Sequence, residues 1–554
     1  MAEEHEVTRR EFLRLAGVAG GVIGLGGGLG GILAACGGGT TTTTGGAATT
    51  AGSTPTTAGA VTTASTTVAS STTLVAPKKG GSLVIVTPDE GSGVIGIPWQ
   101  MQSPQGSTAS SCVDTLVKVT WDGTVEPNLA TSWEIAADGT SITFALQPNA
   151  KFHDGTVCDA TAVKWNFDQW IQSKLGLTNS WVSADAVDAT HVRVNLKTWS
   201  NSVLSGMIDG WLGFISPTAF EKNGQKWAEG NLVSTGPYKL TSVNPGVGWT
   251  CERNPDWWGG EVYLDAIEFK TGKDYNSMQM MLESGQADIG LTNGGNASVQ
   301  TALKEKGFVL LGYGQEEPMC LYPDAGNAKS PWADKKVREA VDYALDRESI
   351  AALGKGMYIP TYEFVDPRST LYDASLERKY DPAKAKELLA ASAYPDGFET
   401  TVWTGGNVFT DPLTVFQQNL ADIGIKLNVE VIDIGAGFGM SMKGWENGFM
   451  TGPAKSWPGY MQGAANWWTD GIFVSAYRSQ ELQTIVDQAM AKKDMADMVP
   501  YNKQLVKLLS DEVAGYPMFI TEYSVGAKAS YVHDDGFGDG PVTSWTPAKC
   551  WLSK

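Results

Sequence analysis

The sequence has few of the residues and motifs that carry most hydrolytic, phosphoryl-transfer and metal chemistry. Its 554 residues include four histidines: His5, His153, His191 and His533. It contains no HExxH zinc motif, no GxSxG nucleophile elbow and no GxxxxGK(S/T) phosphate loop. A bare metal ion held by several imidazoles is therefore not expected, although a chelated metal remains open, and nothing indicates a cofactor.

The histidines do not form a convincing catalytic arrangement. His153 stands beside Asp154, but adjacent side chains rarely aim at one substrate atom. His191 begins a stretch in which apolar and polar residues alternate, so we expect a strand there with the histidine on its polar face. The 60 acidic residues could include a glycosidase pair, because that mechanism needs only two carboxyl groups at the right separation. No pattern in the sequence supports such a pair, and we expect no catalytic residue.

The chain also lacks an excess of positive charge. Its formal net charge is −19, and the charges are spread along the chain rather than grouped in runs. Nucleic acid is therefore not an expected partner, because basic stripes supply that affinity. Of the six cysteines, five follow Cys36, and none of them shows CxxC spacing. An odd count leaves at least one thiol unpaired, and the sequence does not fix a disulfide.

The N-terminal 36 residues carry targeting information rather than fold. Arg9 and Arg10 precede a Gly-rich apolar run that ends at Cys36. This segment resembles a twin-arginine export signal that closes on a bacterial lipobox, in which the cysteine becomes the lipidated first residue. The alternative is a plain transmembrane helix, for which the many glycines make the run weakly hydrophobic. Residues 37–76 consist almost entirely of Thr, Ser, Ala and Gly, so we expect a disordered tether.

The remaining body, from about residue 77 to residue 554, is long enough for two or three domains. Val337, Ala340, Val341, Ala344 and Leu345 recur at helical spacing and predict one apolar helix face. Residues 425–431 alternate like a strand, and helices interspersed with strands indicate an α/β protein.

Many motifs in the body follow one another in a family-specific order. They include Asp114-Thr-Leu-Val-Lys118, Lys151-Phe-His-Asp-Gly155, Thr235-Gly-Pro-Tyr238, Asn254-Pro-Asp-Trp-Trp-Gly259, Ser330-Pro-Trp-Ala-Asp334 and Tyr380-Asp-Pro382. With them the chain resembles the extracytoplasmic solute-binding proteins of the dipeptide, oligopeptide and nickel class (family 5), which serve ATP-driven (ABC) importers. The resemblance covers nearly all of residues 80–554.

This resemblance implies a two-lobed periplasmic-binding-protein-like α/β fold, with two crossovers forming a hinge and a subdomain inserted in the first lobe. Lobe I would comprise residues 77–315 and 525–554, and the insertion about 112–217. Lobe II would comprise residues 316–524. The lobes would close over a solute, and a membrane permease with its ATPase would recognise the closed form. We expect a monomer, held by lipid at the outer face of the cell membrane or in the periplasm.

The resemblance places the ligand wall on the second lobe, in the stretch Ser456-Trp-Pro-Gly-Tyr460. Peptide binders of the family carry an acid there that pairs with the ligand's amino group, but Pro458 and Gly459 occupy its place. A buried ammonium without a counter-charge is costly, so the specificity for a free amino terminus is weakened. Candidate ligand contacts are aromatic side chains suited to stacking: Trp457, Tyr460, Trp467, Trp468, Trp403 and Trp99. Each could instead be a core residue.

Three functional hypotheses remain at this point. The first is a lipid-anchored receptor for a peptide or an oligosaccharide, which the sequence does not separate. The second is a secreted hydrolase with a carboxylate pair, and the third is a surface sensor that uses the same fold without transport.

Overall fold

The computed structural model describes most of the body of the chain. The described ranges are 76–87, 94–100, 110–119, 125–174, 178–201, 203–204, 213–272, 274–291, 297–312, 317–405, 410–432, 434–454, 468–469, 473–494, 496–523, 525–534, 536–537 and 545–554. Within these ranges, none of the helices combines the length and the apolar character that a membrane span requires.

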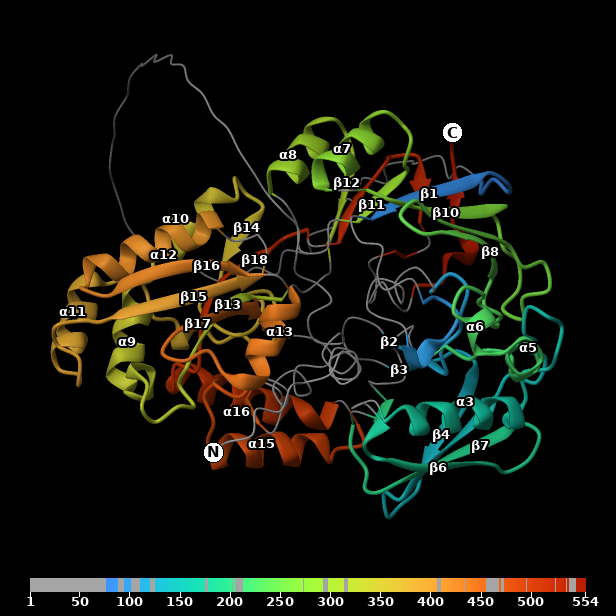
Figure 1. Cartoon of the computed structure of the whole chain (residues 1–554), viewed down its shortest axis with the longest axis horizontal. Coiled ribbons are helices and arrows are strands. Elements are labelled where there is room, and N and C mark those ends of the chain that lie inside the picture. The colour runs from blue at the N-terminus through green and yellow to red at the C-terminus, as the bar shows by residue number, and fades with distance from the viewer. Residues whose placement is uncertain are drawn as a thin grey trace, which may run out of the picture.

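The first lobe is built on a seven-stranded sheet, the lobe I sheet, whose strand order is β12-β19-β11-β1-β10-β9-β8 (Figure 1). Strand β1 lies at its centre, parallel to its neighbours β10 and β11. The strands are β1 (Ser82–Thr87), β8 (Tyr238–Asn244), β9 (Gly248–Arg253), β10 (Ala266–Thr271), β11 (Ile289–Leu291), β12 (Val309–Leu311) and β19 (Gly526–Lys528). Strand β19 comes from the C-terminal end of the chain, which therefore returns to the first lobe.

Each face of the lobe I sheet is covered by its own hydrophobic cluster. Helices α7 (Tyr275–Glu283) and α8 (Ala297–Glu305) cover one face, where Met278, Leu282 and Leu303 pack with Val86. The opposite face packs against residues from the chain end, which carries the short strands β20 (Val532–His533) and β21 (Trp551–Leu552).

A second sheet, the inserted sheet, interrupts the first lobe in sequence. Its order is β4-β5-β7-β6, all antiparallel, and helix α3 packs on it (Figure 1). The bounds are β4 (Ala130–Ile135), β5 (Ser141–Leu146), α3 (Ala160–Ser173), β6 (Trp181–Ala186) and β7 (His191–Leu196). The expected strand is confirmed as β7, in which Val192, Val194 and Leu196 are buried and His191 is half-buried. The short pair β2 (Val117–Val119) and β3 (Val125–Pro127) and helices α5 (Pro217–Asn223) and α6 (Gln225–Ala228) flank this sheet in sequence.

Asp114 connects the beginning of this insertion to the segment that follows β9. Its Oδ2 atom accepts hydrogen bonds from the indole N–H groups of Trp258 (2.7 Å) and Trp257 (3.3 Å). Burial raises the pKa of the Asp114 carboxyl, and the two indole hydrogen bonds oppose that rise. The paired tryptophans of the Asn254–Gly259 motif therefore have a structural role.

The second lobe contains a six-stranded sheet, the lobe II sheet, in the order β14-β18-β13-β17-β15-β16. Its strands are β13 (Met319–Pro323), β14 (Tyr358–Pro360), β15 (Glu399–Gly405), β16 (Lys426–Ile432), β17 (Phe449–Pro453) and β18 (Tyr516–Thr521). Every residue of β18 is buried. The helices are α9 (Lys335–Ala344), α10 (Arg347–Leu353), α11 (Pro382–Ala390), α12 (Thr410–Asp422), α13 (Ile434–Lys443), α15 (Gln480–Met490) and α16 (Val499–Asp511).

The apolar face predicted from residue 337 onward is confirmed in α9. All five of its residues are at most 1% exposed. The segment before the helix contains two successive side-chain caps. Ser330 caps a short 3-10 turn (Pro331–Ala333), and Asp334 then caps α9 by accepting from the backbone N–H of Lys336 at 2.9 Å. The 3-10 turn and α9 therefore each begin with a side-chain cap of their own.

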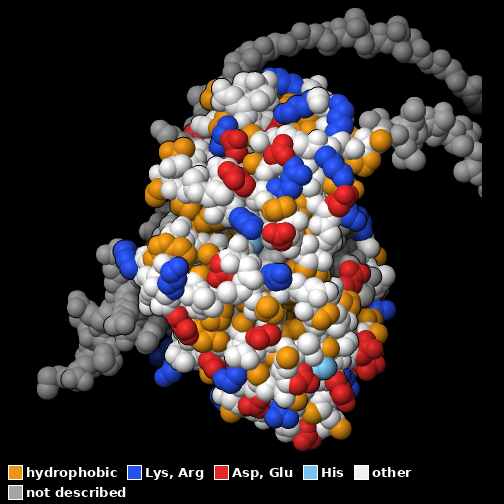
Figure 2. All heavy atoms as spheres, turned by 90° about the vertical axis from the view of Figure 1, so that its right-hand side faces the viewer, with side chains coloured by type: hydrophobic (Ala, Val, Ile, Leu, Met, Phe, Trp, Pro, Cys, Tyr) orange, Lys and Arg blue, Asp and Glu red, His pale blue; other side chains and the backbone are white. Residues whose placement is uncertain are grey.

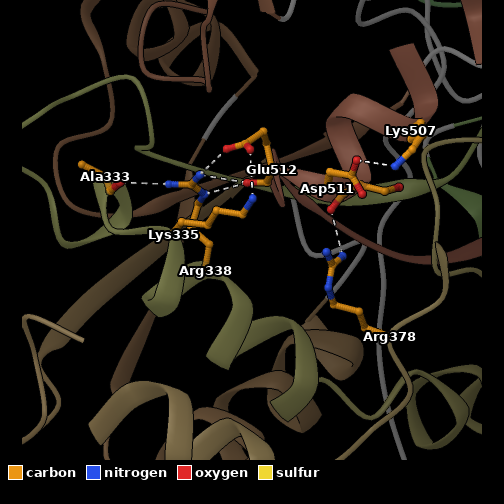
Figure 3. Close-up of polar contacts among 8 residues, drawn as sticks. Ala333, Lys335, Arg338, Arg378, Lys507, Asp511 and Glu512 are labelled. Carbon is orange, nitrogen blue, oxygen red and sulfur yellow. Dashed lines mark hydrogen bonds and ion pairs between the residues drawn. The ribbon is translucent and has the colours of Figure 1, made fainter. Parts of the chain in front are cut away.

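Two arginines satisfy backbone carbonyls at the C-terminal end of α16 (Figure 3). The Nε and Nη2 atoms of Arg338 donate to the carbonyl oxygen of Glu512 at 3.0 and 2.8 Å, and Arg378 donates to that of Ser510 at 2.8 Å. The last carbonyls of a helix have no partner inside the helix, and cations are favourable at this end. The contacts tie α9 and α16 together.

A third arginine, Arg347, is buried in the same lobe. Its side chain is 1% exposed; Nη2 donates to Oδ1 of Asp342 at 2.5 Å and Nε to the carbonyl oxygen of Pro517 at 2.6 Å. One guanidinium thus joins α9, α10 and β18, so it couples two helices to the middle of the sheet.

Candidate ligand-binding site

The chain crosses between the lobe I sheet and the lobe II sheet twice, once after β12 and once after β18. Strand β12 pairs antiparallel with β19, and β13 pairs antiparallel with β18. In addition, the backbone N–H of Val525 donates to the carbonyl oxygen of Leu311 at 3.1 Å. Because the strands at both ends of the two crossings are paired, the crossings begin and end next to each other, as a two-stranded hinge requires. The two-lobed fold is thereby confirmed.

The lobes also touch at a second place, far from the hinge, which we call the rim contact. The indole N–H of Trp199 donates to the carbonyl oxygen of Lys492 at 3.0 Å, and the backbone N–H of Asn201 donates to that of Met490 at 2.7 Å. Lys493 Nζ donates back to the carbonyl oxygen of Ala136 at 2.7 Å. The inserted sheet therefore meets the C-terminal end of α15, as the approach of α15 to this sheet in Figure 1 also shows.

Trp468 lies on the second lobe, among buried aromatic side chains. It is 2% exposed and meets Phe364 edge-on, with ring centroids 5.2 Å apart, and Tyr322 at 5.8 Å. Its indole N–H has no hydrogen-bond partner within the described part of the chain. A buried donor of this kind costs free energy unless something accepts from it. Trp468 therefore packs in the core of lobe II, while its indole N–H has no acceptor among the described residues.

Trp403 and Trp99 lie elsewhere. Trp403 belongs to β15, where it pairs with Glu430 of β16 and donates its indole N–H to that carboxylate at 3.0 Å. Trp99 lies in a 3-10 turn (Pro98–Gln100) and meets Trp165 and Trp170 of α3 edge-to-face at 5.9 and 6.1 Å. Among the described side chains, no ring contact joins Trp99 to Trp403 or Trp468. The other candidates, Trp457, Tyr460 and Trp467, lie outside the described residues.

A buried acid lies beside this aromatic group, and sequence reasoning missed it. Glu363 precedes Phe364 and is fully buried, and its carboxylate accepts from the backbone N–H of Asp373 at 3.1 and 3.3 Å. Burial raises the pKa of Glu363 to about 8. The only sequence signal was a charged residue inside the largely apolar stretch 361–366, which has no clear period. Lobe II therefore holds a carboxyl group whose charge changes near neutral pH.

The histidine–acid pair noted in the sequence is structural. Nε2 of His153 lies 3.1 Å from the carbonyl oxygen of Gly236, and Nδ1 accepts from the backbone N–H of Ser234 at 3.3 Å. Burial lowers the pKa of His153 to about 4, so the ring is neutral at pH 7 and both its nitrogens are engaged by backbone. Asp154 accepts from the Ser216 hydroxyl at 2.6 Å instead. Residues 153–155 form a turn.

Within the described ranges, no three His, Cys, Asp or Glu side chains are grouped so that they could hold a metal ion. On the face that Figure 2 shows, formed by the first lobe with its inserted sheet, acidic and basic side chains are interspersed. This face carries no continuous basic stripe of the kind that binds nucleic acid.

Comparison with known proteins agrees with this architecture. Residues 124–467 match the family model described as bacterial extracellular solute-binding proteins, family 5 Middle. The glutathione-binding protein GsiB of Escherichia coli K12 is 29% identical over 415 residues, covering 71% of this chain and 80% of that protein.

Solved structures share the fold over nearly their whole length. The periplasmic binding protein DppA of Helicobacter pylori, in complex with the peptide STSA, has a TM-score of 0.72 at 21% identity and covers 86% of this chain and 99% of its own. NikA of Brucella suis, in complex with Fe(III)-EDTA, has a TM-score of 0.73 at 22% identity and covers 84% and 100%. With a hinge of paired crossings and a family match over more than half of its length, the chain belongs to the bacterial extracellular solute-binding proteins of family 5.

Proposed function

We propose that this protein is the receptor of an ABC importer that captures a short peptide or peptide-like solute between its lobes and delivers it to the permease. The paired crossings carry the proposal, because they allow two lobes to close about one hinge over a ligand. The glutathione-binding relatives favour a peptide-like solute over a sugar. Binding and release need no covalent chemistry, so the proposal includes no catalytic step.

The proposed domain limits are those expected from the sequence: lobe I at 77–315 and 525–554 with an insertion at about 112–217, and lobe II at 316–524. The sheet memberships of β12, β13, β18 and β19 support them. The proposed ligand wall consists of Trp457, Tyr460, Trp467 and Trp468, with Trp403 and Trp99 as further candidates. The indole N–H of Trp468, which has no acceptor among the described residues, supports a polar ligand atom near that residue.

The proposed location is the outer face of the cell membrane, or the periplasm. Export through the twin-arginine signal at Arg9 and Arg10 and lipidation at Cys36 would leave residues 37–76 as the tether. A tethered monomer could then hand its solute to a neighbouring permease. Mass spectrometry of the mature chain tests this part alone, since it should begin at Cys36 with acyl groups attached.

A thermal-shift screen of the mature protein tests the ligand class. A peptide at 100 times its Kd should add about 2.7 kcal/mol to the free energy of unfolding. The Trp457→Ala variant should lose that shift, while Arg193→Ala, which removes an exposed arginine of the inserted sheet, serves as the control. A shift that survives in Trp457→Ala removes this residue from the wall. Hydrolysis of the peptide during the assay would instead favour the hydrolase alternative.

The missing acid at Pro458–Gly459 predicts that the protein does not distinguish strongly between peptides with a free and a blocked amino terminus. With no counter-charge between Trp457 and Tyr460, acetylating the amino terminus of a bound peptide should change its Kd by less than about tenfold. Isothermal titration with the free and acetylated peptide measures this directly. A much larger loss of affinity on acetylation would mean that an acidic residue from another part of the chain binds the amino group.

An oligosaccharide is the second candidate ligand, favoured by the aromatic composition of the stretch 457–468.

The rim contact predicts an effect on affinity without an effect on folding. The double variant Trp199→Phe/Lys493→Ala removes three hydrogen bonds between the lobes, from Trp199 to Lys492 and from Lys493 to Ala136 and Ala137, worth about 0.5–1.5 kcal/mol each. If these bonds form on closure, the variant should bind its ligand about tenfold more weakly and unfold at nearly the same urea concentration. Lys507→Ala, which removes an exposed lysine paired within α16, is the matched control. Unchanged affinity in the double variant would show that the contact does not contribute to closure.

A further inference from the structure

Two cysteine sulfur atoms face each other in the core of the first lobe. Sγ of Cys112 lies 3.0 Å from Sγ of Cys251, and both residues are 1% exposed. A disulfide bond is 2.03–2.05 Å long, so the sulfurs need to approach by only about 1 Å more to bond. Cys158 and Cys320 lie in two other hydrophobic clusters, and Cys550 lies in the same cluster as this pair.

The backbone fixes this meeting of sulfur atoms. The backbone N–H of Gly236 donates to the carbonyl oxygen of Cys112 at 3.0 Å, and that of Tyr238 donates to Ser111 at 3.1 Å. The segment that carries Cys112 therefore runs beside the start of β8, and β8 pairs with β9, where Leu240 stands opposite Cys251. A side chain at Gly236 would place its Cβ 2.4 Å from the carbonyl carbon of Cys112. The close approach is thus part of the fold.

We propose that Cys112 and Cys251 form a disulfide bond in the exported protein. The family works outside the cytoplasm, where disulfides persist. The oxidant would be a thiol oxidant that carries a disulfide. A thiolate of the pair attacks that disulfide and releases one of its thiols, and the second cysteine then displaces the other. Two protons and two electrons leave the pair, one S–S bond forms in the protein, and the oxidant's S–S bond is reduced to two thiols.

This bond would close a large loop. The two cysteines are 139 positions apart, and the segment between them contains the whole inserted sheet and α3. The bond would fasten the start of this insertion, at Cys112, to strand β9 of the lobe I sheet. Cross-linking so long a loop lowers the conformational entropy of the unfolded chain, so reduction should lower the Tm by several degrees.

Burial should also determine when the bond forms and breaks. The hydrogen bond with the Cys112 thiol and burial raise the pKa of the Cys251 thiol well above its ordinary value, so Cys251 is rarely present as the reactive thiolate in the folded, reduced protein. Because a twin-arginine signal exports folded protein, oxidation is then expected after export, when local opening exposes the pair. The finished bond should resist reduced glutathione until the protein unfolds.

Peptide mapping of the full-length protein, recovered from the extracytoplasmic compartment, tests the proposal. The protein is denatured in N-ethylmaleimide without reductant and digested with trypsin. We expect the peptide containing Cys112 joined to that containing Cys251, with Cys158, Cys320 and Cys550 alkylated. Alkylation of both Cys112 and Cys251, or pairing of either with Cys550, overturns the proposal.

Variants add a second measurement that does not depend on ligand binding. Cys251→Ser should leave Cys112 fully alkylated and abolish the effect of reductant on the Tm. Cys320→Ser, which removes a buried thiol of lobe II, should keep that effect. A reductant-dependent Tm in Cys251→Ser, or a wild-type Tm that reductant does not change, would contradict the proposed bond.

Discussion

Replacing Arg347 with alanine should lower the free energy of unfolding by about 3–5 kcal/mol, because it strands a buried carboxylate. Arg347 and Asp342 are 1% and 7% exposed in their side chains, and their atoms meet at 2.5 Å. Without the guanidinium, Asp342 keeps only Arg378, at 3.4 Å, and the carbonyl of Pro517 loses its donor. Urea unfolding followed by tryptophan fluorescence gives the difference.

The control for this prediction is an ion pair of similar chemistry at the surface. Arg193 and Asp185 are 45% and 44% exposed and meet at 3.0 Å. Exposed pairs contribute little, so Arg193→Ala should cost less than about 1 kcal/mol. A loss this small for Arg347→Ala would mean that water reaches the buried site and that the arginine does not couple α9 and α10 to β18.

Stability should fall as the pH rises from 6.5 to 8, and the Glu363→Gln variant should lose this fall. The pKa of Glu363 is raised to about 8 in the folded protein, against 4.5 as its ordinary value. Between these two values the folded state holds a proton that the unfolded state has released. The associated stability is therefore complete below about pH 4.5 and is lost as the pH rises through 8, by up to about 1.4 kcal/mol per pH unit.

The titration of His153 limits the pH range in which the change in stability reports on Glu363. Its pKa is lowered from 6.5 to about 4, so its contribution to stability is present above pH 6.5 and is lost as the pH falls through 4. Below pH 6.5 the two residues act in opposite directions. Urea unfolding at pH 6.5, 7.25 and 8 separates them. The difference between wild type and Glu363→Gln should change steadily over these three points, and Glu387→Gln, which alters an exposed carboxylate, should track the wild type. A constant difference would place the pKa of Glu363 in the folded protein below this range.

The sequence predicted those parts of the fold that follow from local periodicity. The apolar face of α9, the alternation in β7 and the strand at β16 (predicted as 425–431, observed as Lys426–Ile432) all depend on residues within one or two turns or a few positions of one another. The order of family motifs added the two-lobed arrangement.

What the sequence did not predict depends on contacts between distant segments. Cys112 and Cys251 are 139 positions apart, and Lys493 and Ala136 of the rim contact are 357 apart. No spacing rule brings such residues together. Glu363 was missed for a related reason, since a glutamate is normally exposed and only the surrounding packing buries it. The same limit applies to the proposed ligand wall, which depends on how 457–468 meets the first lobe.

Small-angle X-ray scattering of the mature protein, with and without a peptide that shifts its Tm, tests the central claim most directly. If the lobes close on the ligand about the hinge of paired crossings, the unliganded protein should have a larger radius of gyration and the liganded protein a smaller one. The rim contact should then exist only in the compact form, so Trp199→Phe/Lys493→Ala should need more peptide to reach it. Superimposable scattering curves at saturating peptide would contradict capture by lobe closure.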